Sequence, residues 1–318
     1  MLFVPCRNFV LAAALIGSIA SPAGAADTLK VVTAHGVWDT FPTEAGEKAG
    51  LFKKRDLAVE VIYSAGSGET LQAVISGSAD IGEVGTLGIF GSFASGAPVR
   101  IIGAEATGSA EYWYARADSD IKDMKGAEGK TIAFSSNGSS THSVVRAFIA
   151  EYGLTSAKPV ATGSPAATLT SVMTGQVDVG WASAPFGLKE IEEGKIRIIG
   201  RANDLPSVRG QTIRVIITNT DALATKKSAL QRYMDGRREA IELMYGDDPQ
   251  PLRNFAESNR LTVESARRVR DFYPKAMLAP DEIKGLDGLL TEAVTLKFLQ
   301  RPLTKEQLAE LISLMPRR

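Results

Sequence analysis

Cysteine is almost absent from this sequence. Among 318 residues the only cysteine is Cys6, which precedes the first apolar run and so cannot be the lipid-bearing cysteine that follows a lipoprotein signal. If the N-terminal segment is removed, as argued below, the remaining chain has no disulfide, no thiol nucleophile and no cysteine metal site. An apolar core must therefore stabilise the protein, and roughly 290 residues can supply one.

An excess of charge of either sign is also absent. The 36 Lys and Arg residues balance 36 Asp and Glu residues, so nothing electrostatic favours nucleic acid or an anionic membrane surface as partner. The motifs G-x-S-x-G, G-x-x-x-x-G-K and G-x-G-x-x-G are missing. Ser140 and His142 are two positions apart at a predicted helix start, where their side chains diverge and form no nucleophile–base pair. We therefore expect a binding protein, not an enzyme, with no cofactor.

The first 25 residues have the pattern of a secretory signal peptide. Arg7 is their only charged side chain, an apolar run extends from Phe9 to Ile19, and Ala23-Gly24-Ala25 places small residues where a signal peptidase cleaves. The run is too short to span a bilayer comfortably. Cleavage near Ala25 would leave 35 basic and 36 acidic residues. We expect an exported, periplasmic protein; a buried N-terminal helix is the alternative.

Strand-like and helix-like segments alternate along the rest of the chain. The order predicts parallel sheets covered by helices on both faces, in two α/β lobes followed by a helical tail. We expect lobe 1 at 26–116, lobe 2 at 117–212, and a return to lobe 1 with C-terminal helices at 213–318. The predicted strands are 29–33, 57–63, 81–84, 99–103, 131–134, 158–161, 177–181, 196–199 and 212–218. The predicted helices are 41–50, 69–76, 87–94, 140–152 and 166–174, with helical apolar stripes from Leu223 onward.

Glycine- and serine-rich loops follow several predicted strands and lead into helices. They are Ser64 to Thr70, Asn137 to His142, and Gly163-Ser164-Pro165. In open α/β sheets ligands bind at the carboxyl ends of the strands. Free N–H groups at a helix start, together with hydroxyl donors, suit an oxyanion. The alternative for any one loop is that Ser139 or Ser140 only caps its helix.

The two histidines and two of the tryptophans also fall at predicted strand ends. We expect His142, and also His35, to donate a hydrogen bond to a ligand. The alternative is a metal site formed by both histidines with Glu69 and Glu83, but the spacing of these residues matches no common metal-binding motif. Trp38 and Trp181, one per lobe, are candidates to clamp the organic part of a ligand. Packing in each lobe's own core is their alternative.

The sequence resembles the periplasmic solute-binding proteins of ABC importers for sulfonates, nitrate, taurine and thiamine-precursor pyrimidines. The resemblance covers roughly Leu29 to Thr218 and is carried by three stretches. These are Ala65-Gly66 through Gly77-Ser78-Ala79-Asp80-Ile81-Gly82, then Met124-Lys125-Gly126 through Gly138-Ser139-Ser140-Thr141-His142, and Gly175-Gln176-Val177-Asp178 through Pro185-Phe186. The second stretch is most similar to the aliphatic-sulfonate binders.

The resemblance implies a type II periplasmic-binding fold in which two crossover strands act as a hinge. It also implies a monomer that binds a small molecule and contacts a membrane permease, and a set of ligand contacts. We add Trp181 and Ser183, which we expect in the cleft. The expected contacts are then His35, Gly36, Trp38, Ser67, Gly68, Glu69, Thr70, Gly85, Thr86, Gly138, Ser139, Ser140, Thr141, His142, Trp181 and Ser183.

One departure from the family pattern bears on the ligand. Sulfonate binders usually carry Trp-Asp before the last proline, where this chain has Ser183-Ala184. Smaller residues there enlarge the pocket, so we expect an organic oxyanion, a sulfonate or carboxylate, with room for an aromatic group. Three alternatives stay open: a neutral or cationic ligand paired with Glu69 or Glu83, a binding module for a membrane sensor, and the related pyrimidine-making enzyme. The last requires a cytosolic chain with a cysteine-rich motif.

Overall fold

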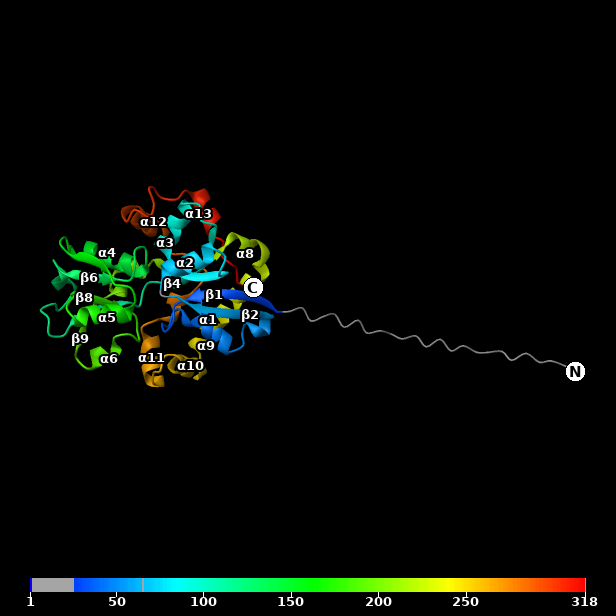
Figure 1. The fold of residues 1–318 in the computed structure, drawn as a ribbon, viewed down its shortest axis with the longest axis horizontal. Coiled ribbons are helices and arrows are strands. Elements are labelled where there is room, and N and C mark those ends of the chain that lie inside the picture. Colours follow the sequence, from blue (N-terminus) through cyan, green and yellow to red (C-terminus); the bar gives the residue numbers. More distant parts are fainter. Residues whose placement is uncertain (2–25, 65, 318) are drawn as a thin grey trace.

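The computed structural model describes Met1, residues 26–64 and residues 66–317. Apart from Met1, the predicted signal peptide lies outside the described residues, as does Ala65 of the first glycine-rich loop. The described chain forms two α/β lobes, each built on one five-stranded sheet (Figure 1). The predicted bilobed α/β architecture is confirmed.

The sheet of lobe 1 contains strands from the first and the last part of the chain. They are β1 (Asp27–Thr33), β2 (Leu57–Tyr63), β3 (Ile81–Gly85), β4 (Val99–Thr107) and β10 (Thr212–Asn219). Their order is β2-β1-β3-β10-β4. Strand β1 is parallel to β2 and β3, whereas β10 is antiparallel to both β3 and β4.

The sheet of lobe 2 repeats this arrangement. Its strands are β5 (Tyr112–Arg116), β6 (Thr131–Phe134), β7 (Lys158–Ala161), β8 (Val179–Ala182) and β9 (Ile196–Arg201). Their order is β7-β6-β8-β5-β9. Strand β6 is parallel to β7 and β8, and β5 is antiparallel to β8 and β9.

One strand in each sheet departs from the predicted parallel arrangement. Strands β5 and β10 are the first strands after the chain passes from one sheet to the other, so each enters its new sheet in the reverse direction. Strand β5 was not predicted, and its residues were assigned to lobe 1, but it pairs within the second sheet. The chain therefore crosses at residues 108–111. The predicted lobe limits otherwise stay a prediction.

Helices cover both sheets, and they group by lobe in Figure 1. They are α1 (Phe41–Lys48), α2 (Ser67–Ile75), α3 (Thr86–Ala94), α4 (Ser140–Tyr152), α5 (Pro165–Met173), α6 (Leu188–Glu192), α7 (Pro206–Arg209), α8 (Thr220–Thr225), α9 (Lys227–Met244), α10 (Gln250–Ser258), α11 (Val263–Asp271), α12 (Leu286–Thr295) and α13 (Lys305–Leu311). Short 3₁₀ helices are η1 (Lys53–Arg55), η2 (Met124–Ala127), η3 (Ala202–Asp204) and η4 (Lys275–Leu278). None of the described helices is both long and apolar enough to cross a bilayer.

Each lobe has its own apolar core. In lobe 1, Val215 and Ile217 of β10 pack into one cluster and Ile216 packs into another. Since side chains alternate across a strand, β10 is buried on both faces, which explains its continuous apolar sequence. In lobe 2, Trp113 of β5 and Phe148 of α4 belong to one cluster, which Ile213 of β10 joins from the lobe 1 sheet. Most of the apolar packing therefore lies within the lobes.

Candidate ligand-binding site

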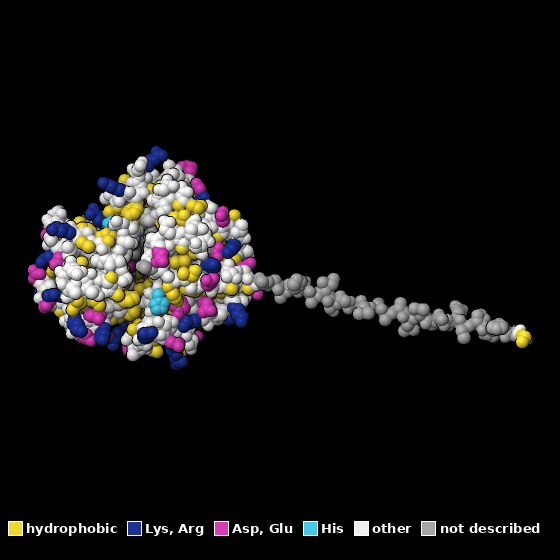
Figure 2. Space-filling view, in the orientation of Figure 1, with side chains coloured by type: hydrophobic (Ala, Val, Ile, Leu, Met, Phe, Trp, Pro, Cys, Tyr) yellow, Lys and Arg dark blue, Asp and Glu magenta, His cyan; other side chains and the backbone are white. Residues whose placement is uncertain are grey.

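A cavity of about 260 Å³ lies between the two lobes. The space-filling view shows a furrow between them (Figure 2). Lobe 1 lines the cavity with Ala34, His35, Val37, Asp39, Thr40, Ser64, Gly66, Ser67, Thr70, Glu83, Glu105 and Arg214, and Glu111 lies on the crossing segment. Lobe 2 contributes Ser135, Ser139, Ser140, Thr141, Gly163, Ser164, Pro165, Trp181, Ser183 and Phe186. Pockets for drug-sized ligands usually enclose about 300–1,000 Å³, so this cavity suits a small solute.

Three helices begin at this cavity. Helix α2 starts at Ser67, α4 starts after its N-cap Ser139, and α5 starts after its N-cap Ser164. The hydroxyl of Ser139 accepts a hydrogen bond from the His142 N–H at 3.2 Å, and that of Ser164 accepts one from the Ala167 N–H at 3.2 Å. These caps leave other first-turn N–H groups without an intrahelical partner. The cavity is therefore bordered by the positive ends of helices from both lobes.

Some of the cavity hydroxyls hold their own loop in place. The Thr141 Oγ1 atom accepts from the Ser135 N–H at 2.8 Å and lies 2.9 Å from the hydroxyls of Ser135 and Ser139. In lobe 1 the Ser64 and Thr70 hydroxyls are 2.6 Å apart. Ser140 differs, because its hydroxyl accepts from Arg214 of the opposite lobe at 3.2 Å. Ser140 is thus the hydroxyl of this loop that bridges the cleft.

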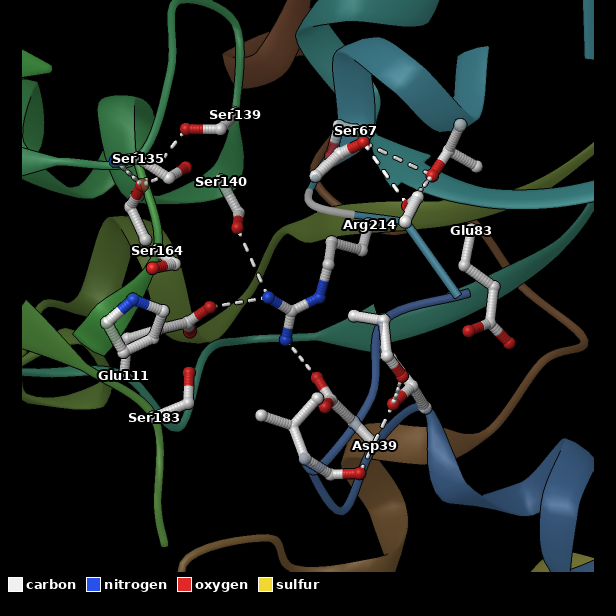
Figure 3. Close-up of a pocket in the computed structure, with 18 of the residues that line it drawn as sticks. Asp39, Ser67, Glu83, Glu111, Ser135, Ser139, Ser140, Ser164, Ser183 and Arg214 are labelled. Carbon is white, nitrogen blue, oxygen red and sulfur yellow. Dashed lines mark hydrogen bonds and ion pairs between the residues drawn. The ribbon is translucent and has the colours of Figure 1, made fainter. Parts of the chain in front are cut away.

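Arg214 of β10 lies at the centre of the charged wall of the cavity (Figure 3). Its guanidinium donates to Asp39, donates to Glu111 at 2.5 Å, and lies 3.4 Å from Glu105. Burial alone would lower the pKa of Arg214, but the neighbouring carboxylates of Asp39, Glu111 and Glu105 raise it well above its usual value. Arg214 therefore stays charged.

A second buried ion pair lies beside it. Arg237 of α9, which is fully buried, donates to the Glu83 carboxylate at 2.5 Å, and the Thr33 hydroxyl also donates to Glu83. Burial raises the pKa of Glu83, against the opposing effect of Arg237. Glu83 is thus held in place by lobe 1, on the edge of the cavity.

Several buried polar atoms at the cavity have no hydrogen-bond partner among the described residues. They are both carboxylate oxygens of Glu105, one oxygen of Glu111, the Arg214 Nε and the Trp181 Nε1. Glu105 is 1% exposed, and burial, followed by the nearby Glu83, raises its pKa well above the usual value. Buried polar groups in folded proteins nearly always have partners in protein or ordered water, so these acceptors and donors are the candidate ligand contacts of the cavity.

Half of the predicted site residues line the cavity. They are His35, Ser67, Thr70, Ser139, Ser140, Thr141, Trp181 and Ser183. The other half do not line it: Gly36, Trp38, Gly68, Glu69, Gly85, Thr86, Gly138 and His142. Each of the two sets includes residues from both lobes.

Trp38 and His142, which do not line the cavity, contact residues of their own lobes instead. Trp38 is fully buried in the lobe 1 core, and its Nε1 donates to the Tyr245 hydroxyl at 3.0 Å, so the alternative of core packing is correct for it. The His142 ring stacks on Phe134 with centroids 4.4 Å apart, and its Nδ1 accepts from the Gly138 N–H at 3.2 Å. Burial, with help from Arg146, lowers the pKa of His142. His142 is a neutral side chain that supports the loop.

Two of the predicted glycines lie against the opposite lobe. A Cβ atom at Gly85 would lie 2.9 Å from the Gly138 carbonyl and 3.2 Å from the Ser140 nitrogen, and one at Gly138 would lie 2.8 Å from the Phe298 ring. A Cβ at Gly36 would first meet the Asn259 side chain of its own lobe, at 2.9 Å. The Thr86 hydroxyl donates to the Thr212 carbonyl at 2.7 Å, within lobe 1. The missing side chains at Gly85 and Gly138 thus allow the two lobes to approach closely.

Sequence reasoning missed most of the charged wall. Asp39, Glu105, Glu111 and Arg214 were not predicted, and neither were Ser135 and Ser164 as single residues. A signal exists in the strands themselves: Glu105 and Arg214 each interrupt an otherwise apolar run, as Glu83 does in β3. A charge within a strand that is buried on both faces must have a partner or a function.

The described residues contain no group of three or more His, Cys, Asp or Glu side chains arranged to hold a metal ion. Of the weakly supported metal set, His35 and Glu83 line the cavity, whereas His142 and Glu69 do not.

Residues 40–250 of the chain match the protein family described as NMT1/THI5-like. No curated protein matches the sequence. Among solved structures, the fold is similar to that of the alkanesulfonate-binding protein SsuA from Xanthomonas axonopodis pv. citri bound to MOPS, with 18% identity, 90% of this chain and 98% of that chain covered, and a TM-score of 0.75.

Two further neighbours have similar scores. The periplasmic aliphatic sulphonate binding protein SsuA from Escherichia coli has 17% identity, covers 92% of this chain and 94% of its own, and has a TM-score of 0.73. The periplasmic nitrate-binding protein NrtA from Synechocystis PCC 6803 has 15% identity, covers 89% and 84%, and has a TM-score of 0.70. The predicted periplasmic-binding fold is confirmed.

Proposed function

Because this chain belongs to the NMT1/THI5-like family, we propose that it is the extracytoplasmic solute-binding component of an ABC importer. It captures a small organic solute between its lobes and delivers it to a membrane permease. The solved neighbours support this, since they include sulfonate- and nitrate-binding proteins of the periplasm. The observation that carries the proposal is a cavity lined from both lobes at the carboxyl ends of their strands.

The acidic end of the solute, a sulfonate or carboxylate, binds against lobe 2. Helices α4 and α5 begin there, Ser139 and Ser140 line the wall, and the Trp181 Nε1 needs an acceptor. An anion at a helix start gains up to about 2 kcal/mol when partly buried, and charge-assisted hydrogen bonds contribute about 1.5–3 kcal/mol each. Micromolar affinity corresponds to about 8 kcal/mol, which a few such contacts reach after the costs of binding. Trp181 and Phe186 cover the organic part.

Lobe closure couples binding to transport. Gly85 of lobe 1 lies against the backbone of Gly138 and Ser140, and the Ser140 hydroxyl bonds to Arg214 across the cleft. A solute that contacts both lobes stabilises this closed arrangement relative to an open one. The permease then distinguishes loaded from empty protein by shape.

Export follows from the N-terminal pattern. We propose that residues 1–25 are a cleaved signal peptide and that the mature protein is a periplasmic monomer. Expression from the full sequence in a Gram-negative host, followed by cell fractionation and N-terminal sequencing, tests this. A mature N-terminus near Ala26 in the periplasmic fraction is expected, and an intact N-terminus in the cytosol would contradict it.

The binding function is tested on the purified mature protein. A thermal-shift screen against alkyl and aryl sulfonates, aromatic carboxylates, nitrate and pyrimidines should show stabilisation by one class, because a ligand that binds only the folded state raises its stability. Calorimetry with that class should then show weaker binding by Ser140→Ala. The control is Ser228→Ala, an exposed serine near the start of α9. Equal affinities of wild type and Ser140→Ala would contradict the proposed anion position.

A further inference from the structure

At the cavity, the lobe 1 wall and the crossing segment together carry more negative than positive groups. Asp39, Glu83, Glu105 and Glu111 line the cavity and are each at most 7% exposed, whereas Arg214 is the single Lys or Arg among the described lining residues, which also include His35. Arg237, behind the wall, pairs with Glu83. Four carboxylates therefore share two guanidinium groups, an arrangement that costs free energy unless another positive charge is supplied.

The two arginines leave some of these carboxylate oxygens without a hydrogen bond. Arg214 already donates to Asp39, Glu111 and Ser140, and Arg237 to Glu83. Both oxygens of Glu105 and one oxygen of Glu111 remain without a hydrogen bond among the described residues, although Glu105 lies 3.4 Å from the Arg214 Nε. Both side chains are more than nine-tenths buried and line the cavity. Three acceptor atoms without a hydrogen bond, one of them ion-paired with the Arg214 Nε, therefore lie at one small site.

A purely anionic solute would not satisfy this wall. It offers no donor to the bare oxygens, and it would add a negative charge beside four carboxylates in a small, largely buried space where charges interact strongly. A neutral N–H donor would supply hydrogen bonds and leave the charge uncompensated. A protonated amine or an amidinium supplies both donors and charge.

We propose that the solute carries a positively charged nitrogen group, which binds to the free oxygens of Glu105 and Glu111. The inference rests on the proposed binding function and specifies its substrate class: a zwitterion with its cationic nitrogen toward lobe 1 and its acidic group toward lobe 2. Lobe 2 is suited to the acidic group, because Trp181 Nε1 is a buried donor without a partner among the described residues and Ser139, Ser140 and Ser164 lie at the starts of α4 and α5. In Figure 3 these serines lie on the same side of Arg214 as Glu111, so Glu105 is the carboxylate assigned to the lobe 1 side.

The titration behaviour of the wall agrees with this assignment. Burial and the neighbouring carboxylates of Glu83 and Asp39 raise the pKa of Glu105 well above its usual value, while Arg214 and Arg237 oppose the increase. A bound cation favours the ionised carboxylate and displaces a proton from it. Affinity for a zwitterion should therefore increase as pH rises, up to the point at which the amine itself loses its proton.

Matched ligands test the inference by calorimetry on the mature protein. The first pair is 3-aminopropane-1-sulfonate and butane-1-sulfonate, which differ by an ammonium in place of a methyl group. The second pair is 4-aminobutanoate and pentanoate, and the third is 4-(aminomethyl)benzoate and 4-ethylbenzoate. We expect the zwitterion of at least one pair to bind tenfold or more tightly than its partner.

The variant Glu105→Gln identifies the group responsible. Because the Glu105 oxygens make no hydrogen bond to the described residues, the substitution breaks none there and removes only the charge that pairs with the Arg214 Nε at 3.4 Å. We expect it to reduce the zwitterion preference at least tenfold while butane-1-sulfonate binds as well as before or better. Asp118→Asn, an exposed carboxylate of lobe 2, is the control.

The outcomes separate this inference from the proposed function. Equal or tighter binding of the simple anions, or a zwitterion preference unchanged by Glu105→Gln, would overturn the cationic subsite and leave the solute-binding function in place. If none of the six compounds binds, the zwitterion assignment fails; the solute-binding function fails only if the full thermal-shift screen also finds no ligand. A thermal unfolding curve for Glu105→Gln that matches wild type shows that the variant is folded.

Discussion

The two walls of the cleft differ in how they bind. Lobe 2 presents serine hydroxyls, helix starts and the Trp181 indole N–H, all of them neutral donors. Lobe 1 presents the charged groups Asp39, Glu83, Glu105 and Arg214, of which Arg214 pairs with Asp39 and Glu105 while Glu83 pairs with Arg237 behind the wall. The repeated sheet topology therefore supports unlike chemistry. Because the topology is shared and the walls are not, the specificity lies in residues at the strand ends and not in the fold.

The largest effect is expected from the centre of the charged wall. Arg214→Met would leave Asp39, Glu105 and Glu111 without their shared cation. Removing one partner of a buried ion pair costs about 3–5 kcal/mol, so the free energy of unfolding should fall by that amount in urea titrations. The control Arg267→Met removes a half-exposed arginine and should change it by less than about 0.5 kcal/mol. Equal small changes for both would show that the wall does not depend on Arg214.

A second substitution tests whether a buried carboxylate of lobe 1 also faces neutral or basic groups of lobe 2 outside the cavity. Glu292 of α12 faces Ser143 and Arg146 of α4, and burial raises its pKa to about 7 from an ordinary value of 4.5. The folded protein therefore holds this proton more tightly than the unfolded chain, so the stability contributed at low pH is lost as pH rises from about 4.5 through 7. The loss is about 3 kcal/mol in total.

Glu292→Gln should remove that dependence. We expect the variant and wild type to be similarly stable at pH 4.5, and the variant to be more stable at pH 8. Urea titrations at both pH values measure the difference. If the wild-type protein is instead more stable than the variant at pH 8, then Ser143 and Arg146 stabilise the ionised Glu292 more than burial destabilises it, which would contradict the raised pKa.

The next prediction concerns the contact between the walls. Gly85→Val would place a side chain against the Gly138 carbonyl at 2.9 Å from its Cβ, so the closed arrangement becomes overpacked by about 1–3 kcal/mol. Solute affinity measured by calorimetry should fall about tenfold or more. The control Gly88→Ala has room, since its Cβ would be 3.7 Å from the same carbonyl. Equal affinity in Gly85→Val and wild type would show that the solute binds without this closure.

The smallest effect is expected from the support of the lobe 2 loop. His142→Phe keeps the ring on Phe134 and loses the acceptor for the Gly138 N–H. The net cost of one such hydrogen bond is about 1 kcal/mol, in stability or in solute affinity. Asn at this position, which keeps an acceptor, serves as the comparison in chemical denaturation. A loss of several kcal/mol in solute affinity in His142→Phe, measured by calorimetry, would indicate that His142 contacts the solute directly.

The sequence predicted the lobe 2 wall of the cleft better than the charged lobe 1 wall. Apolar periodicity located most strands and helices, because burial imposes it, and the glycine-serine pattern located the lobe 2 wall. Strand β5 was missed because its aromatic run gave no alternation, and the antiparallel entry of β5 and β10 depends on which sheet each joins. Glu105 and Arg214 lie on neighbouring strands far apart in sequence, so their pairing emerges only from the topology.

The glycines show a different limit. A glycine that lets a ligand approach and one that lets another lobe approach have the same sequence pattern. Gly85 and Gly138 were predicted to contact the ligand, and in the structure a Cβ at either position would instead meet the opposite lobe. Sequence cannot separate the two cases, because both need only the absence of a side chain.

The most direct test is a crystal structure of the mature protein with the tightest-binding zwitterion of the matched pairs. We predict electron density between the lobes, with the nitrogen hydrogen-bonded to Glu105 or Glu111 and the acidic group at Ser140 or the Trp181 Nε1. Density outside the interlobe cavity, or a solute in the reverse orientation with its acidic group on Glu105, would contradict the proposed division of the cleft into a cation-binding and an anion-binding wall.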